Sequence, residues 1–150
     1  MRRKDRERDA AFAWEVFDRT PFGVLSLRDG EGAYGVPISP ARVGETVYFH
    51  CAREGKKQAC IARQPQASLT VVGPVAPDYF GCRYRSAILR GRISPVEDEE
   101  ERAEALRAIS QRYCPGDMAD FDAYLAPRLA ATAVYRMDVT EITGKERGFA

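Results

Sequence analysis

Short apolar runs separated by turn residues fill the first third of the chain and limit the folds it can adopt. Within residues 22–51, FGVLSLRDGEGAYGVPISPARVGETVYFHC, the runs are interrupted at Asp29-Gly30 and again at 43–45, where the sequence reads Val-Gly-Glu. Asp-Gly pairs favour tight turns, and apolar runs between such turns are typical of antiparallel strands. We therefore expect three strands of an antiparallel meander in this region.

Later segments complete the expected sheet and flank it with helices. Alternating or β-branched runs predict further strands at 67–73, 84–96 and 133–147. Helical periodicity covers 9–20, 56–64, 97–114 and, more weakly, 121–132. Six short strands with helices at the ends and at one crossover predict a closed or nearly closed antiparallel barrel. Parallel winding is disfavoured because strands and helices do not alternate regularly.

Size and charge are those of one globular domain. The chain has 150 residues, 45% of them hydrophobic and 30% charged, with a net charge of +1, so nothing predicts protein-wide attraction to nucleic acid or membrane. The start, MRRKDRERD, resembles the basic region of a signal peptide, but Glu15 and Asp18 interrupt the adjoining apolar segment and no cleavage-like site appears. We expect a cytoplasmic protein without a membrane span, since no apolar run approaches about 18 residues.

The N-terminal charges do not predict a nucleic-acid partner. The cations and anions of this segment alternate: Arg2, Arg3, Lys4, Arg6 and Arg8 are balanced by Asp5, Glu7 and Asp9. Alternation of this kind favours a self-neutralising helix face over a phosphate-binding arm.

Cysteine and histidine usage disfavours a metal site. Four cysteines are scattered without a Cys-x-x-Cys pair, and His50 is the only histidine. Structural zinc sites normally bring two ligands close in sequence, so reduced thiols packed as small apolar groups are expected. Cys51, beside His50, is expected to be a neutral packed thiol.

The segment YFHCAREGKK, residues 48–57, combines a strand end with a cationic helix start. Lys56 and Lys57 fall in the first turn of the expected helix, where the dipole disfavours each cation by about 0.3–1 kcal/mol. Free backbone N–H groups at a helix start form an anion site, and Gly55 would allow close approach of a ligand. The alternative is a solvated basic turn whose lysines point to water.

Two other segments suit an anionic ligand. Pro37 lies within an apolar strand and supplies no N–H, so that strand is expected at an edge or a bulge of the sheet. Arg83, Arg85 and Ser86 begin another strand and carry groups that bind phosphate. The alternatives are an ordinary edge proline and an exposed arginine-rich face.

Five segments in order, MRRKDRE, GVPI, VYFHCAREGKK, YRSAILRGR and VYRMDVTEITGK, together resemble the nitroimidazole-reductase (Nim-like) branch of the pyridoxamine 5′-phosphate oxidase-like flavin proteins. The resemblance spans nearly the whole chain, and its most specific part is YFH-x-A-x-x-G-K-K with the later ITGK. It implies a fold that is mainly β with α, a six-stranded antiparallel FMN-binding split barrel with flanking helices. Residues 1–150 would form this single domain, which would assemble as a homodimer.

The resemblance also implies, position by position, the residues that would bind FMN. The phosphate would lie against Lys56 and Lys57, with Arg85 and Ser86 near the phosphate or the ribityl chain. The rest of the cofactor would contact Phe49, His50, Ala52, Val36, Pro37 and Ile38. Pro40 and the turn-rich segment 73–82 depart most from the family pattern.

The implied activity is that of an FMN-dependent oxidoreductase acting on a small organic acceptor, a nitroaromatic such as a 5-nitroimidazole being one candidate. His50 is the candidate catalytic residue, as proton donor or substrate clamp, with a structural role as the alternative. No dinucleotide glycine fingerprint is present, so NAD(P)H would be a diffusing donor. The rival interpretation is a non-catalytic flavin- or haem-binding carrier or sensor, in which His50 would be an axial ligand of the iron.

Overall fold

An antiparallel sheet that does not close on itself organises the computed structural model, which describes residues 2–30 and 32–148. Eight strands make up the described sheet: β1 (Glu7–Arg8), β2 (Gly23–Asp29), β3 (Gly32–Ile38), β4 (Ala41–Val43), β5 (Thr46–Cys51), β6 (Gln66–Asp78), β7 (Gly81–Pro95) and β8 (Ala133–Arg147). Their order is β3-β2-β6-β7-β8-β5-β4, and β1 pairs with the far end of β8. The expected fold class, a mainly β split barrel with helices, is confirmed.

The split lies between β3 and β4. These strands are consecutive in the chain yet occupy opposite ends of the hydrogen-bonded order, and only the Ser39-Pro40 connection joins them. Pro37 lies on β3, so the prediction that this proline marks an edge strand is correct. A proline at an edge removes no hydrogen bond that the sheet needs.

The expected count of six strands is two too low for the described residues. The extra strands, β1 and β4, have two and three residues, which is too short for an alternating pattern to be recognised. The N-terminal residues form a short 3-10 turn, Lys4–Arg6, followed by β1, and not the expected helix face. Self-neutralisation does occur there, through ion pairs that join Arg3 to Asp5 and Lys4 to Glu7.

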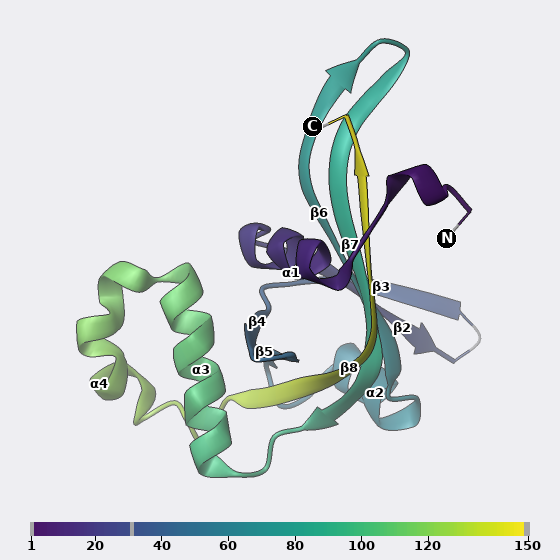
Figure 1. The fold of residues 1–150 in the computed structure, drawn as a ribbon. Coiled ribbons are helices and arrows are strands. Elements are labelled where there is room, and N and C mark those ends of the chain that lie inside the picture. The colour runs from purple at the N-terminus through teal and green to yellow at the C-terminus, as the bar shows by residue number, and fades with distance from the viewer. Residues whose placement is uncertain (1, 31, 149–150) are drawn as a thin grey trace.

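A long hairpin, here called the arm, extends from the barrel (Figure 1). It consists of the end of β6 and the start of β7, where the turn-rich segment 73–82 continues both strands instead of ending them. A register shift between Val72 and Val75 accommodates Gly73 and Pro74, because a bulge tolerates a residue without an N–H.

Helices cover the barrel at three places. Helix α1 (Ala10–Arg19) is capped by Asp9, whose side chain accepts a 2.8 Å hydrogen bond from the backbone N–H of Phe12. The helix contacts β6, β7 and β8. Helix α2 (Lys56–Arg63) packs on β2, and α3 (Glu99–Tyr113) contacts β4, β5 and β8. A 3-10 turn at Pro115–Asp120 leads into α4 (Phe121–Leu125), which is shorter than the segment 121–132 expected to be helical.

Two apolar clusters hold these layers together. The barrel cluster joins α1 and α2 to the sheet and includes the fully buried Phe17, Leu25, Phe49, Leu69 and Leu89. The smaller cluster joins α3 and α4 to β4, β5 and β8 around Tyr48, Leu106, Ile109, Phe121 and Val134. Among the helices that the structure describes, none is long and apolar enough to cross a bilayer.

Candidate functional site

The strand β5 ends beside the start of α2, and this junction holds five of the ten residues predicted to bind FMN. The helix begins after Gly55, which has φ +146 and makes no side-chain cap. That φ lies in the region that disfavours other residues, so the glycine is a conformational requirement here. No acidic residue lies in the first turn of α2, and Lys56 and Lys57 are its first two residues. Backbone N–H groups at such a start have no partner within the helix.

The two lysines take different directions. The ammonium of Lys56 lies 2.6 Å from Oδ2 of Asp29 at the end of β2 and 4.8 Å from the ring centre of Tyr34 on β3. The ammonium of Lys57 lies 5.5 Å from the ring centre of Phe49 and makes no ion pair with any described carboxylate. The dipole penalty for Lys56 is therefore offset by Asp29, whereas the charge of Lys57 remains available to an anion.

Phe49 and His50 lie on opposite faces of β5. Phe49 is 1% exposed and stacks on Tyr135 of β8 with ring centres 5.7 Å apart. His50 is exposed and pairs across the strands with Val134. Partial burial of the ring, together with the positive charge of Lys57, lowers the pKa of His50 below its usual 6.5. The imidazole is therefore mainly neutral at pH 7.

The backbone after β5 is fixed by Gln58 of α2. Its side-chain amide donates to the carbonyl of Ala52 and lies 3.2 Å from the sulfur of Cys51. Burial raises the pKa of the Cys51 thiol, so this group is neutral at pH 7. Sequence reasoning named Ala52 but missed Gln58, Asp29, Tyr34 and Tyr135. Only Gln58, in the first turn of the helix, has a local signal.

The remaining predicted residues are distributed differently. On β3, Val36 and Ile38 pack against the barrel cluster, with Ile38 only 6% exposed, whereas Pro37 is exposed. Arg85 and Ser86 are not brought to α2. Ser86 pairs with Lys145 while His50 pairs with Val134, which separates them by roughly 35 Å of strand at about 3.3 Å per residue.

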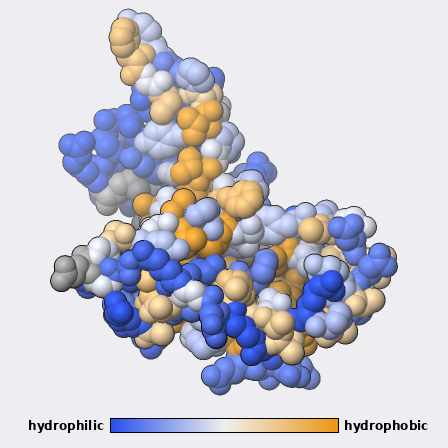
Figure 2. All heavy atoms as spheres, turned by 180° about the vertical axis from the view of Figure 1, so that it is seen from behind, coloured by the Kyte–Doolittle hydropathy of each residue, from blue (hydrophilic) through white to orange (hydrophobic). Residues whose placement is uncertain are grey.

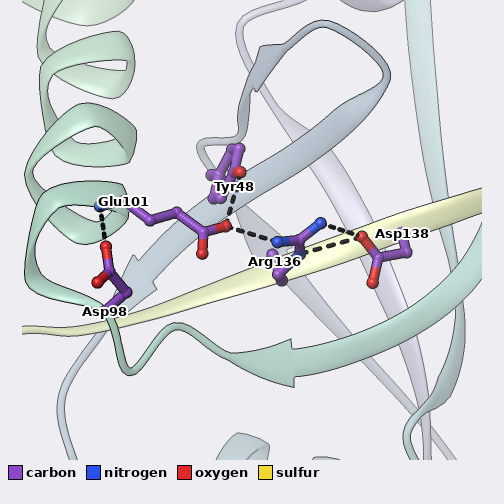
Figure 3. Close-up of polar contacts among 5 residues, drawn as sticks. All are labelled: Tyr48, Asp98, Glu101, Arg136 and Asp138. Atoms are coloured by element: carbon purple, nitrogen blue, oxygen red, sulfur yellow. Dashed lines mark hydrogen bonds and ion pairs between the residues drawn. The ribbon is translucent and has the colours of Figure 1, made fainter.

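A polar network fixes β5 and β8 to α3 (Figure 3). Tyr48 donates a 2.9 Å hydrogen bond to Glu101, which also accepts from Arg136 at 2.8 Å, and Arg136 in turn binds Asp138. Asp98 caps the helix by accepting from the backbone N–H of Glu101 at 2.8 Å. Burial, followed by the hydrogen bond to Glu101, raises the pKa of Tyr48 to about 12. Tyr48 thus anchors β5 to α3 immediately before Phe49 and His50.

Since His50 is the only histidine, its titration can be followed directly by proton NMR. We expect a midpoint below 6.5, because burial and Lys57 disfavour the imidazolium. Lys57→Ala should raise that midpoint, since it removes a nearby positive charge. Lys56→Ala is the matched control and should leave the midpoint near its wild-type value, because the Lys56 charge is paired with Asp29. A wild-type midpoint above 6.5 would contradict this arrangement.

Comparison with known proteins identifies the family of the chain. Residues 9–146 match the family model described as pyridoxamine 5′-phosphate oxidase. No curated protein matches the chain.

Solved structures share the fold. One is the flavocytochrome Anf3 from Azotobacter vinelandii, with 27% identity, a TM-score of 0.83, and coverage of 99% of this chain and 72% of that chain. Another is an FAD and heme binding protein from Mycobacterium smegmatis, with 23% identity, a TM-score of 0.82, and coverage of 95% and 74%. A candidate 5-nitroimidazole antibiotic resistance protein from Bacteroides thetaiotaomicron has 22% identity, a TM-score of 0.75, and coverage of 93% and 84%. The matched residues and the open antiparallel sheet place this chain in the pyridoxamine 5′-phosphate oxidase family of flavin-binding split barrels.

Proposed function

We propose that this protein is an FMN-dependent oxidoreductase that reduces a small organic acceptor, with nitroaromatic compounds such as 5-nitroimidazoles as the class to test. The observation that carries the proposal is the uncapped start of α2, where Gly55, free backbone N–H groups and Lys57 meet at the end of β5. The likeness to the Bacteroides protein guides the choice of acceptor.

The residues at this junction fit a flavin phosphate. A phosphate at the start of α2 would accept hydrogen bonds from the backbone and would be stabilised by the helix dipole. Lys57 would add a positive charge that pairs with no described carboxylate. Lys56 would leave its ion pair with Asp29 and turn toward the phosphate. The single phosphate of FMN suits one helix start.

Bound FMN would supply the hydride or electron transfer. The chain itself contributes orientation and proton handling. His50 is exposed beside the cationic Lys57, and its lowered pKa keeps the ring neutral at pH 7, so it can hold one proton and offer one acceptor nitrogen. NAD(P)H would enter as a diffusing donor.

The deciding experiment is a visible absorption spectrum of the purified protein with identification of the released cofactor by mass. A flavin spectrum with FMN released supports the proposal, and anaerobic turnover of a 5-nitroimidazole with NADPH then tests the activity. A colourless protein that fails to bind added FMN would overturn it. If the protein binds FMN but turns over no nitroaromatic, a flavin carrier would describe its function better than an oxidoreductase.

Lys57→Ala should weaken FMN binding by about 1–3 kcal/mol, the scale of a charge-assisted hydrogen bond. Fluorescence quenching of FMN titrated with apoprotein measures the change. Arg107→Ala removes the same charge from α3, where Arg107 pairs with Asp122, and is the matched control. Equal FMN affinity for Lys57→Ala and wild type would place the phosphate elsewhere.

A second candidate function is a haem- or flavin-binding carrier. The flavocytochrome favours this function, because its structure matches 99% of this chain at 27% identity. His50 would then be the axial ligand, and its exposed position on β5 leaves the ring accessible. A Soret band in the same spectrum would make this function the leading one.

The arm supports the proposal of a homodimer. Apolar side chains are exposed along it, including Val72 at 53%, Val75 at 59% and Phe80 at 93%, and they continue toward the barrel in the view from behind (Figure 2). Large exposed apolar patches mark interaction sites. Contact of Arg85 and Ser86 with a flavin bound at α2 would require such a second copy.

We expect Val75→Asp to give monomers in analytical ultracentrifugation, because it places a charge within the exposed apolar surface of the arm. Val43→Asp, on β4 and outside the arm, is expected to leave the dimer intact.

A further inference from the structure

A pocket whose lining includes no residue of α2 lies on the α3 side of the barrel. It has a volume of about 390 Å³ and is formed by the loop after β5, the connection from β7 to α3, and the residues around the start of β8. Its apolar walls include Val96 and Val134, and its charged groups are Arg53, Glu97 and Arg102. Pockets that bind small ligands combine apolar walls with a few polar groups in this way, at roughly 300–1,000 Å³.

Arg102, in the lining of this pocket, carries an unsatisfied donor. Its side chain is 14% exposed, and its Nε is buried without a hydrogen-bond partner among the residues that the structure describes. The ion pair that Arg102 makes is long: Nη2 lies 3.7 Å from the carboxylate of Glu99, whose side chain is 82% exposed. A buried N–H without an acceptor is rare in folded proteins. Such a donor, in the lining of a pocket, indicates a ligand that accepts a hydrogen bond.

Arg53 supplies the second guanidinium. It is exposed in the loop after β5, and one of its N–H groups donates to the carbonyl of Ala130. A guanidinium has five donors, so this tether fixes the side chain and leaves others for a ligand. Two guanidiniums and the carboxylate of Glu97 give the lining a charge of one positive unit. A monoanion matches that charge, whereas a dianion would leave excess negative charge against Glu97.

We propose that this pocket binds a small organic carboxylate with an apolar or aromatic body. The carboxylate lies between Arg53 and Arg102 and accepts from Nε of Arg102, because planar guanidinium and carboxylate groups match in geometry. The apolar body lies against Val96 and Val134, on the α3 side of the sheet. Since Val134 is the cross-strand partner of His50, the bound acid lies on the same face of the sheet as the imidazole.

Binding is tested directly on the purified full-length protein, without any turnover assay. Benzoate, benzamide and inorganic phosphate are titrated into ¹⁵N-labelled protein and followed by NMR. We expect saturable shifts with benzoate at the amides of Arg53, Val96, Arg102 and Val134, and at least about tenfold weaker binding of benzamide, which lacks the charge. Binding of phosphate tighter than benzoate, equal binding of benzamide, or no shifts with any probe would each overturn the proposal.

Variants separate the two guanidiniums from general charge. Arg53→Ala and Arg102→Lys should each weaken benzoate binding at least about tenfold, the latter because lysine keeps the charge but lacks the Nε donor. Arg90→Ala removes an exposed cation on β7 and is the matched control. If circular dichroism shows that Arg102→Lys does not fold, the test rests on Arg53→Ala. Wild-type affinity in Arg53→Ala would refute the assignment, whether or not the protein proves to reduce nitroaromatics.

Discussion

Gly91→Ala is expected to lower the free energy of unfolding by about 3 kcal/mol, the upper end of the usual cost of overpacking. Gly91 lies on β7 where the register with β8 shifts, and a Cβ there would clash with the carbonyl oxygen of Asp138 and lie 2.9 Å from its carbonyl carbon. These atoms belong to the backbone of the neighbouring strand and cannot rotate away. The central strands β7 and β8 would have to separate, at the cost of ladder hydrogen bonds.

Denaturant unfolding of Gly91→Ala measures this effect, with the slope m checked against wild type. Gly116→Ala is the matched control, because a Cβ at Gly116 would meet no heavy atom within 4 Å. That control is expected to stay within about 0.5 kcal/mol of wild type. A loss below about 1 kcal/mol in Gly91→Ala would show that the two strands do not approach as closely as the structure has them.

Glu146→Gln is expected to cost about 3 kcal/mol of stability. Glu146 is 7% exposed, and its two carboxylate oxygens accept from Arg8 at 3.0 Å and from Arg85 at 2.8 Å. Removing one partner from a buried ion pair typically costs about 3–5 kcal/mol. The low end applies because both arginine side chains are partly exposed, which screens the charges. An amide would also direct its N–H₂ group toward a guanidinium.

Glu141→Gln, on the same strand, is the matched control for Glu146. Its ion pair with Arg90 is 3.8 Å long and both side chains are more than half exposed, so the expected change is at most about 0.5 kcal/mol. Thermal and denaturant unfolding of the two variants at pH 7 gives the comparison. Similar losses in both would mean that burial does not strengthen the Glu146 pairs.

Local patterns were sufficient where an element depends on its own residues. The helical periodicity of 9–20 predicted α1, and the Asp29-Gly30 turn predicted the hairpin of β2 and β3. The arm was missed because Gly73 and Pro74 read as a strand end, whereas pairing with β7 carries the chain through a bulge. Long-range hydrogen bonds decided that segment.

The sequence by itself determined the strand-to-helix junction, because Gly55, Lys56 and Lys57 are adjacent and their backbone preferences and charges act over one turn. Only the tertiary structure decided what these charges meet. Asp29 pairs with Lys56 across 27 positions, a partnership set by the packing of α2 on β2. The tertiary structure also placed Arg102 of α3 and Arg53 of the β5–α2 loop in the lining of one pocket. Contacts between segments distant in the sequence depend on sheet order and helix packing, which no local pattern encodes.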